Sequence, residues 1–202
     1  MSQPSIQRLD ASRFRRMPWK NGGGTTTELA IEPPDATLDT PFHWRLSMAD
    51  VAVSGPFSRF EGCDRTLLLL DGAGMRLDIE GREPLHLPGP LQPVSFRGDW
   101  TTAGQLLGGP CRDFNVITRR SVCRHRLEVL RGGPAVQTLP GGSIRFVFCV
   151  HGHARLNDLD LDLHGMSLIR LEGLEGPIHV STPLNVDTVL VAIASDPEVV
   201  PC

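Results

Sequence analysis

Glycine and proline interrupt this chain so often that their spacing limits what it can fold into. The 202 residues include 21 glycines and 17 prolines, which follow no collagen-like period. The short segments between them suit β-strands joined by tight turns better than long helices. Hydrophobic residues make up 40% of the chain, which is enough for a sizeable core. We therefore expect an all-β protein with few short helices, the best helix signal being residues 10–16.

A strand followed by a glycine turn occurs twice. The run Arg65–Gly72 consists of an arginine, an apolar stretch and a terminal glycine, and the run Arg145–Gly152 repeats this order. Each run precedes a second predicted strand, at Met75–Glu80 and at Arg155–Leu163. Because few residues are identical, chance similarity between two hairpins is an alternative. The wider pattern favours an internal duplication that produces two jelly-roll barrels.

Charge and cysteine content exclude several classes of protein. The formal net charge of −3 argues against binding to nucleic acid or to anionic membranes. No stretch approaches the length of a membrane span, and the first ten residues lack the apolar core of a signal peptide. The five cysteines form no C-x-x-C pair, so neither a disulfide framework nor a zinc site is indicated. We predict a cytoplasmic protein with free thiols.

Residues 44–48 alternate between apolar and polar side chains, as in a strand with two different faces. The apolar face carries Trp44, Leu46 and Met48, whereas Arg45 and Ser47 occupy the polar face. In a barrel, such a polar face points either to solvent or into a ligand cavity. Both interpretations stay open at this point.

Several motifs occur in the order found in the HutD/Ves family and cover most of the chain. They are Trp19–Thr25, Trp44–Ala49, Gly55–Ser58, Arg65–Gly72, Phe96–Asp99 and Gly109–Arg120. The chain therefore resembles this family, and the resemblance implies a double-cupin fold. We assign residues 1–115 to the first barrel, with some exchange of strands, and residues 116–202 to the second.

The resemblance also has implications for function. HutD proteins are associated with bacterial histidine utilisation, which they are thought to moderate rather than catalyse, and the Ves branch is associated with stress responses. A pathway intermediate such as urocanate or N-formylglutamate is the ligand that this association implies. Because one fold hosts many functions, the family alone does not establish an activity.

One stretch matches the spacing of a cupin metal motif. His151, His153, Asp158 and Gly165 fit the order of ligands and glycine, with Asp in place of Glu. The internal repeat, however, places Gly152 in a hairpin turn. The two histidines would then flank that turn instead of converging inside a barrel. We expect no metal and no cofactor.

Two arginines occupy the positions where the repeat would place the metal-binding glutamate. A guanidinium stays protonated and offers only hydrogen-bond donors, so Arg65 and Arg145 repel cations and suit carboxylates. Arg65 either enters the first barrel to bind an anion or forms a structural ion pair with Asp64 or Glu61. For Arg145, a structural role is favoured.

The other candidate ligand contacts are polar or aromatic residues of the family motifs. We predict ligand binding by Lys20, Asn21, Thr25, Arg45, Ser47, Arg65, Phe96 and Asn115. The glycine-rich segment around Lys20 forms either the mouth of the cavity or only a turn that enters a strand. Phe96 lines the pocket or packs in the core. Asp113 shares a strand face with Asn115, and we expect it to hold the two barrels together.

The leading hypothesis is a metal-independent protein that binds a small carboxylate ligand in a sensing or regulatory role. No nucleophile motif appears, so no catalytic residue is assigned. The alternative is a cupin-class enzyme, either metal-dependent or an acid–base isomerase or hydrolase. A third possibility is a partner-binding protein whose barrels form a homodimer.

Overall fold

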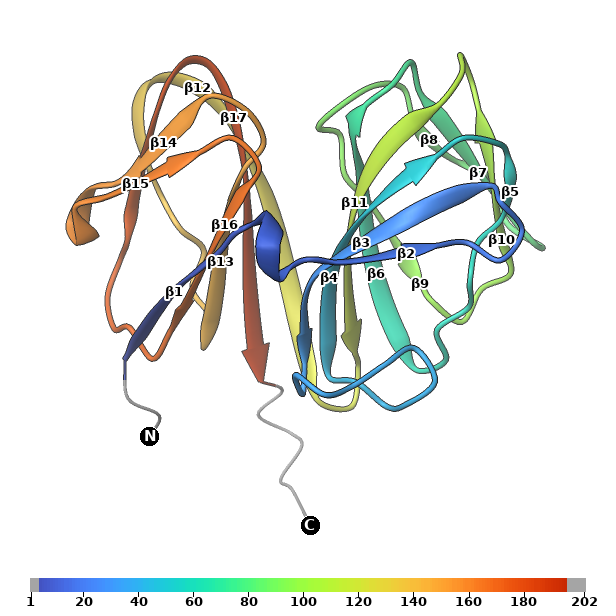
Figure 1. Ribbon diagram of the computed structural model, residues 1–202, viewed down its shortest axis with the longest axis horizontal. Helices are drawn as coiled ribbons and strands as arrows, with labels where there is room; N and C mark the ends of the chain where they lie inside the picture. Colours follow the sequence, from blue (N-terminus) through green and yellow to red (C-terminus); the bar gives the residue numbers. More distant parts are fainter. Residues whose placement is uncertain (1–3, 196–202) are drawn as a thin grey trace. The chain divides into compact units, whose positions relative to one another are not determined.

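The computed structural model describes residues 4–195, which form two compact units built mainly from β-strands (Figure 1). One unit spans residues 14–123. The other joins the N-terminal residues up to 13 to the chain from residue 124 onwards. The all-β prediction is confirmed. The division predicted after residue 115 falls inside a continuous strand, Cys111–Arg119, so the boundary lies further along the chain.

The unit of residues 14–123 contains two antiparallel sheets that share one apolar core. In spatial order, the six-stranded sheet consists of β2 (Arg15–Pro18), β3 (Gly24–Glu32), β4 (Trp44–Val51), β11 (Cys111–Arg119), β6 (Cys63–Asp71) and β9 (Val94–Arg97). The four-stranded sheet consists of β5 (Gly55–Pro56), β10 (Thr102–Leu106), β7 (Met75–Ile79) and β8 (Leu85–Leu87).

Alternation along β6 determines what this unit encloses. Leu67 and Leu69 point into an apolar cluster that also contains Met75 and Leu77 from the facing sheet. Successive side chains of a strand alternate between its two faces, so Arg65 lies on the same face as these leucines. The sequence thus places a guanidinium next to an aliphatic core.

The second unit contains one large antiparallel sheet. In spatial order, its strands are β1 (Ser5–Leu9), β16 (Ser167–Glu172), β13 (Ile144–Cys149), β17 (His179–Ser195), β14 (His153–Leu156) and β15 (Leu161–His164), and β12 (Cys123–Thr138) also pairs with β17. The N-terminal strand β1 belongs to this sheet because it pairs with β16 along its whole length.

Strand pairing is similar in the two units. Strand β6 lies between β11 and β9, and β13 lies in the same way between β17 and β16. The hairpin β7–β8 likewise corresponds to β14–β15. The pairing agrees with the internal repeat seen in the sequence, although the duplication itself stays a prediction.

Two short segments form 3₁₀ turns where the sequence predicted a helix and a continuous strand. The helix signal at residues 10–16 yields only a 3₁₀ turn, Ala11–Arg13, because the chain from Arg15 pairs with β3 instead. The predicted strand Arg155–Leu163 is interrupted by a second 3₁₀ turn, Asn157–Leu159. Within residues 4–195, no helix has the length and apolar character needed to cross a membrane.

The turn between β6 and β7 gives a test of this packing. Gly72 has a φ of +116°, and a Cβ added there would lie 2.5 Å from the Cβ of Cys111. We expect Gly72→Ala to lower the free energy of unfolding by about 2–4 kcal/mol, measured by urea denaturation. Gly89→Ala is the control, since a Cβ there meets no atom within 4 Å. Equal losses in the two variants would contradict the packing described.

Candidate functional site

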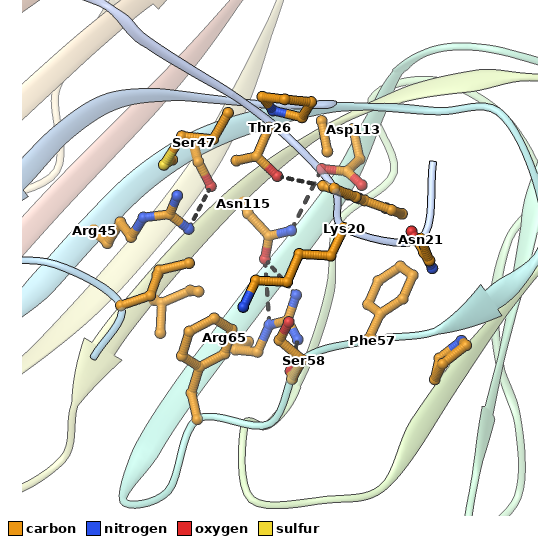
Figure 2. A pocket seen from close by; sticks show the side chains of 18 residues that line it. Lys20, Asn21, Thr26, Arg45, Ser47, Phe57, Ser58, Arg65, Asp113 and Asn115 are labelled. Carbon is orange, nitrogen blue, oxygen red and sulfur yellow. Dashed lines mark hydrogen bonds between the residues drawn. The ribbon is translucent and has the colours of Figure 1, made fainter. Parts of the chain in front are cut away.

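A cavity of about 510 Å³ lies within the unit of residues 14–123 (Figure 2). Its wall consists of side chains from β3, β4, β6 and β11, together with the β2–β3 turn and the segment that follows β5. The strand register explains this gathering, because Arg45 lies opposite Ile117 and Ser47 opposite Asn115 in neighbouring strands. The polar face predicted for β4 therefore faces the cavity.

Arg65 extends from β6 into this cavity and is only 5% exposed. Its Nε and Nη2 atoms donate hydrogen bonds to Oδ1 of Asn115, over 3.4 and 3.1 Å. Its Nη1 atom donates to the backbone carbonyl oxygen of Ser58, over 3.2 Å. All of these acceptors are neutral, so the hydrogen bonds hold the guanidinium in place without balancing its charge.

Three phenyl rings surround the same guanidinium. Its Cζ atom lies 5.4 Å from the ring centre of Phe57, 5.3 Å from that of Phe60 and 5.0 Å from that of Phe96. Aromatic faces attract cations, and Arg is the side chain that most often stacks on them. Burial in these surroundings lowers the pKa of Arg65 to about 10, so the side chain still carries its charge at neutral pH.

The structural alternative for Arg65 was an ion pair with Asp64 or Glu61. Asp64 instead pairs with Arg120 at 2.9 Å, and Glu61 pairs with Arg59. In the part of the chain that the structure describes, Arg65 makes no ion pair. No carboxylate therefore contacts the guanidinium directly, although the nearby Asp113 acts on it electrostatically.

Asp113 also lines the cavity, which differs from the role we expected for it between the barrels. It is 2% exposed, and Nδ2 of Asn115 donates a hydrogen bond to its Oδ1 over 3.4 Å. Burial raises the pKa of Asp113 to about 7, although the charge of Arg65 and the hydrogen bond from Asn115 oppose this shift. As expected from the sequence, it lies on the same face of β11 as Asn115, two residues further along the strand.

A second arginine in the cavity wall is balanced by a carboxylate. The Nε atom of Arg45 donates to Oε2 of Glu28 over 2.7 Å, and its Nη1 donates to Oγ of Ser47 over 3.4 Å. Its Nη2 atom is buried and has no hydrogen-bond partner among the described residues. The sequence alone did not predict a role for Glu28, because this residue reaches Arg45 only through the pairing of β3 with β4.

The β2–β3 turn forms one rim of the cavity. Lys20 is exposed there, and Oδ1 of Asn21 accepts a hydrogen bond from the backbone N–H two residues further on, which shapes the turn. Thr26 lines the cavity and accepts a hydrogen bond from Nε1 of Trp19 over 2.8 Å. Thr25 does not line it, because adjacent residues of a strand face opposite ways.

The structure brings six of the eight predicted ligand-binding residues to the cavity wall. They are Lys20, Asn21, Arg45, Ser47, Arg65 and Asn115. Thr25 lies outside the wall. Phe96 packs in the apolar core, and its ring lies against the guanidinium of Arg65. Sequence reasoning missed Phe57 and Phe60, whose rings reach Arg65 from the loop between β5 and β6.

In the second unit, His151 and His179 each lie beside a different carboxylate, and His153 lies opposite His164 in the β14–β15 pair. His151 lies 4.0 Å from Asp187, and Nδ1 of His179 lies 3.0 Å from Asp158. Gly152 adopts a positive φ of +73°, as a tight turn requires. Among residues 4–195, no three His, Cys, Asp or Glu side chains gather in a way that could hold a metal ion.

Comparison with solved structures defines the class of protein. Oxalate decarboxylase from Lactobacillus farciminis, solved as a formate complex, has a TM-score of 0.64 and 9% identity, covering 98% of this chain and 88% of that one. At this identity the similarity concerns the fold alone. The chain is an all-β protein that resembles cupin-fold proteins.

The chain belongs to the HutD family, whose model matches residues 11–187. HutD from Pseudomonas fluorescens SBW25, solved in the formate condition, has a TM-score of 0.81 and 34% identity, covering 95% of this chain and all of that one. An uncharacterised 21.2 kDa protein in the hutC 3′ region of Pseudomonas putida is 37% identical over 176 residues, or 86% of this chain and 89% of that protein. Protein Ves from Escherichia fergusonii is 36% identical over 149 residues, covering 72% and 74%. The predicted resemblance to HutD and Ves is confirmed.

The ion pair behind the cavity gives a stability test. Replacing Glu28 by Gln leaves the buried Arg45 charge without its carboxylate, so we expect Glu28→Gln to lower the free energy of unfolding by about 3 kcal/mol. Arg15→Ala serves as the control. Arg15 also binds Glu28, but its side chain is 49% exposed, so its loss should cost less than about 1 kcal/mol. Similar losses in both variants, measured by urea denaturation, would show that Arg45 does not depend on Glu28.

Proposed function

We propose that this HutD-family protein binds a small carboxylate metabolite in the cavity of residues 14–123, without a metal, in a sensing or regulatory role. The observation that carries the proposal is the Arg65 guanidinium, which is buried in the cavity wall and has only neutral acceptors around it. A buried charge with no carboxylate in direct contact is costly, so a ligand that supplies the opposite charge is favoured, most strongly when Asp113 is protonated.

The hydrogen bonds of Arg65 leave room for a carboxylate. Its three contacts with Asn115 and Ser58 use three of the five guanidinium N–H groups, which leaves one N–H on each terminal nitrogen. Two such groups can bind the two oxygens of one carboxylate, an arrangement in which charge assists both hydrogen bonds.

The rest of the cavity favours a small organic acid over an inorganic anion. Its volume lies in the range typical of metabolite sites. Phe57, Phe60 and Ile117 supply apolar wall, so the ligand would have an apolar or flat body beside its carboxylate. Lys20 at the rim could meet a second negative group. Urocanate has the flat body, and N-formylglutamate has the second carboxylate.

The family context supports the choice of these two acids. Similar proteins are named HutD or lie in a hutC 3′ region, which places the family in a histidine-utilisation context. Both acids are intermediates of histidine breakdown. The regulatory role is inferred from this association.

Calorimetry with urocanate, N-formylglutamate, formate and histidine tests the proposal. We expect wild-type protein to bind at least one of the acids, and Arg65→Gln to weaken that binding about 10- to 100-fold, because two charge-assisted hydrogen bonds are lost. Arg97→Gln is the control, since it removes an exposed arginine from β9 of the same sheet. Unchanged affinity in Arg65→Gln would refute the assigned site.

A second candidate function is acid–base catalysis, which the position and acidity of Asp113 favour. A carboxyl group that titrates near neutral pH inside a cavity can both donate and accept a proton. Turnover of one of the acids, followed by NMR and lost in Asp113→Asn while binding persists, would favour an enzyme. Stable acids after long incubation would favour a binding protein.

A further inference from the structure

We propose that anion binding in this cavity is coupled to the uptake of one proton by Asp113, so that the protein takes up a carboxylate and a proton together. This inference rests on the proposed function, because it concerns the same cavity. It adds a dependence on pH that neither the fold nor the family predicts.

The coupling follows from the geometry of three buried side chains. Asn115 accepts hydrogen bonds from Arg65 through Oδ1 and donates one to Asp113 through Nδ2 (Figure 2). Arg65, Asp113 and Asn115 are each less than 8% exposed. The guanidinium and the carboxyl group thus influence each other across one neutral amide, in surroundings where water screens little.

Two charged groups on the strands beside β11 affect the pKa of Asp113. Arg65 on β6 favours the ionised carboxylate, and Asp50 on β4 opposes it, although Asp50 is itself paired with Arg112 at 2.6 Å. Arg45, also on β4, has its charge balanced by Glu28 at 2.7 Å. Burial outweighs these interactions and raises the pKa of Asp113 to about 7.

The remaining neighbours leave Asp113 as the group that titrates near neutrality. Cys111, on the same strand, is a thiol whose pKa burial raises to about 12, so it stays neutral. Lys20 lies at the rim of the cavity and is exposed to solvent. No histidine is among the side chains that line this cavity in the described chain.

Charge balance then decides which form of the protein the anion prefers. When Asp113 is ionised, it compensates the charge of Arg65 and repels an incoming carboxylate. When Asp113 is protonated, Arg65 is uncompensated and the carboxylate supplies the missing charge. By linkage, the anion favours the protonated form and binding raises the pKa of Asp113 further.

Affinity for the anion falls as the pH rises through the pKa of Asp113. Below about pH 6, Asp113 is already protonated in the free protein, so affinity is constant. As the pH rises through about 7, free protein loses this proton and must regain it on binding. The dissociation constant then rises, approaching roughly tenfold per pH unit.

The test is calorimetry with formate and N-formylglutamate between pH 5.5 and 8.5, in buffers of different ionisation enthalpy. The carboxyl groups of both probes titrate below about pH 5, so any change above that pH belongs to the protein. We expect affinity to fall above about pH 7 and proton uptake to approach one per bound anion. Binding that is independent of pH, with no proton uptake, would overturn the coupling and leave the binding function intact.

Variants separate this coupling from the binding function. Asp113→Asn keeps the shape without the charge, so it should bind with constant affinity across the range, and more tightly than wild type at pH 8.5. Asp50→Asn, at a half-exposed position, should keep the same slope with pH but shift the midpoint slightly lower, because it removes a charge that opposes ionisation of Asp113. Arg65→Gln should weaken binding about 10- to 100-fold at every pH. If wild-type protein binds neither these anions nor urocanate at any pH, the binding function itself fails. An Asp113→Asn variant with wild-type pH dependence would overturn the coupling, because the proton would then be taken up by another group.

Discussion

The burial of one guanidinium with no carboxylate in direct contact is the constraint on which the rest of this site depends. Removing a charge from water costs several kcal/mol, and Arg65 recovers part of this from three aromatic rings, an amide oxygen and a backbone carbonyl. None of these neighbours neutralises it. A fold that required only a filled interior would place an aliphatic residue here, as it does at Leu67 and Leu69.

The architecture supplies this site by dividing one sheet face into two regions. Along β6 the inward positions change from arginine to leucine, and along β11 Asp113 and Asn115 face the same interior. The apolar region packs against the four-stranded sheet and stabilises the unit. The polar region remains open as a cavity, closed on one side by the loop that carries Phe57 and Phe60. The apolar part of this sheet face thus stabilises the unit, and the polar part lines the cavity that we propose binds the ligand.

Sequence patterns predicted those parts of the site that alternation within a strand determines. The period of two correctly placed Arg45 and Ser47 on one face, and the family motifs pointed to Arg65. The same reasoning misplaced Thr25, because a glycine-rich turn hides where the alternation starts. Glu28 could not be predicted, because its contact with Arg45 arises from pairing between strands. The helix expected at residues 10–16 was wrong because pairing with β3 outweighed the local signal.

The most direct measurement is the stability of a variant in which Arg65 is replaced by Met, an uncharged side chain of similar length. If the guanidinium is kept for a ligand and not for the fold, Arg65→Met should be at least as stable as wild type in urea denaturation without ligand. A loss of about 2 kcal/mol or more would contradict this, because it would show that the charge holds the unit together.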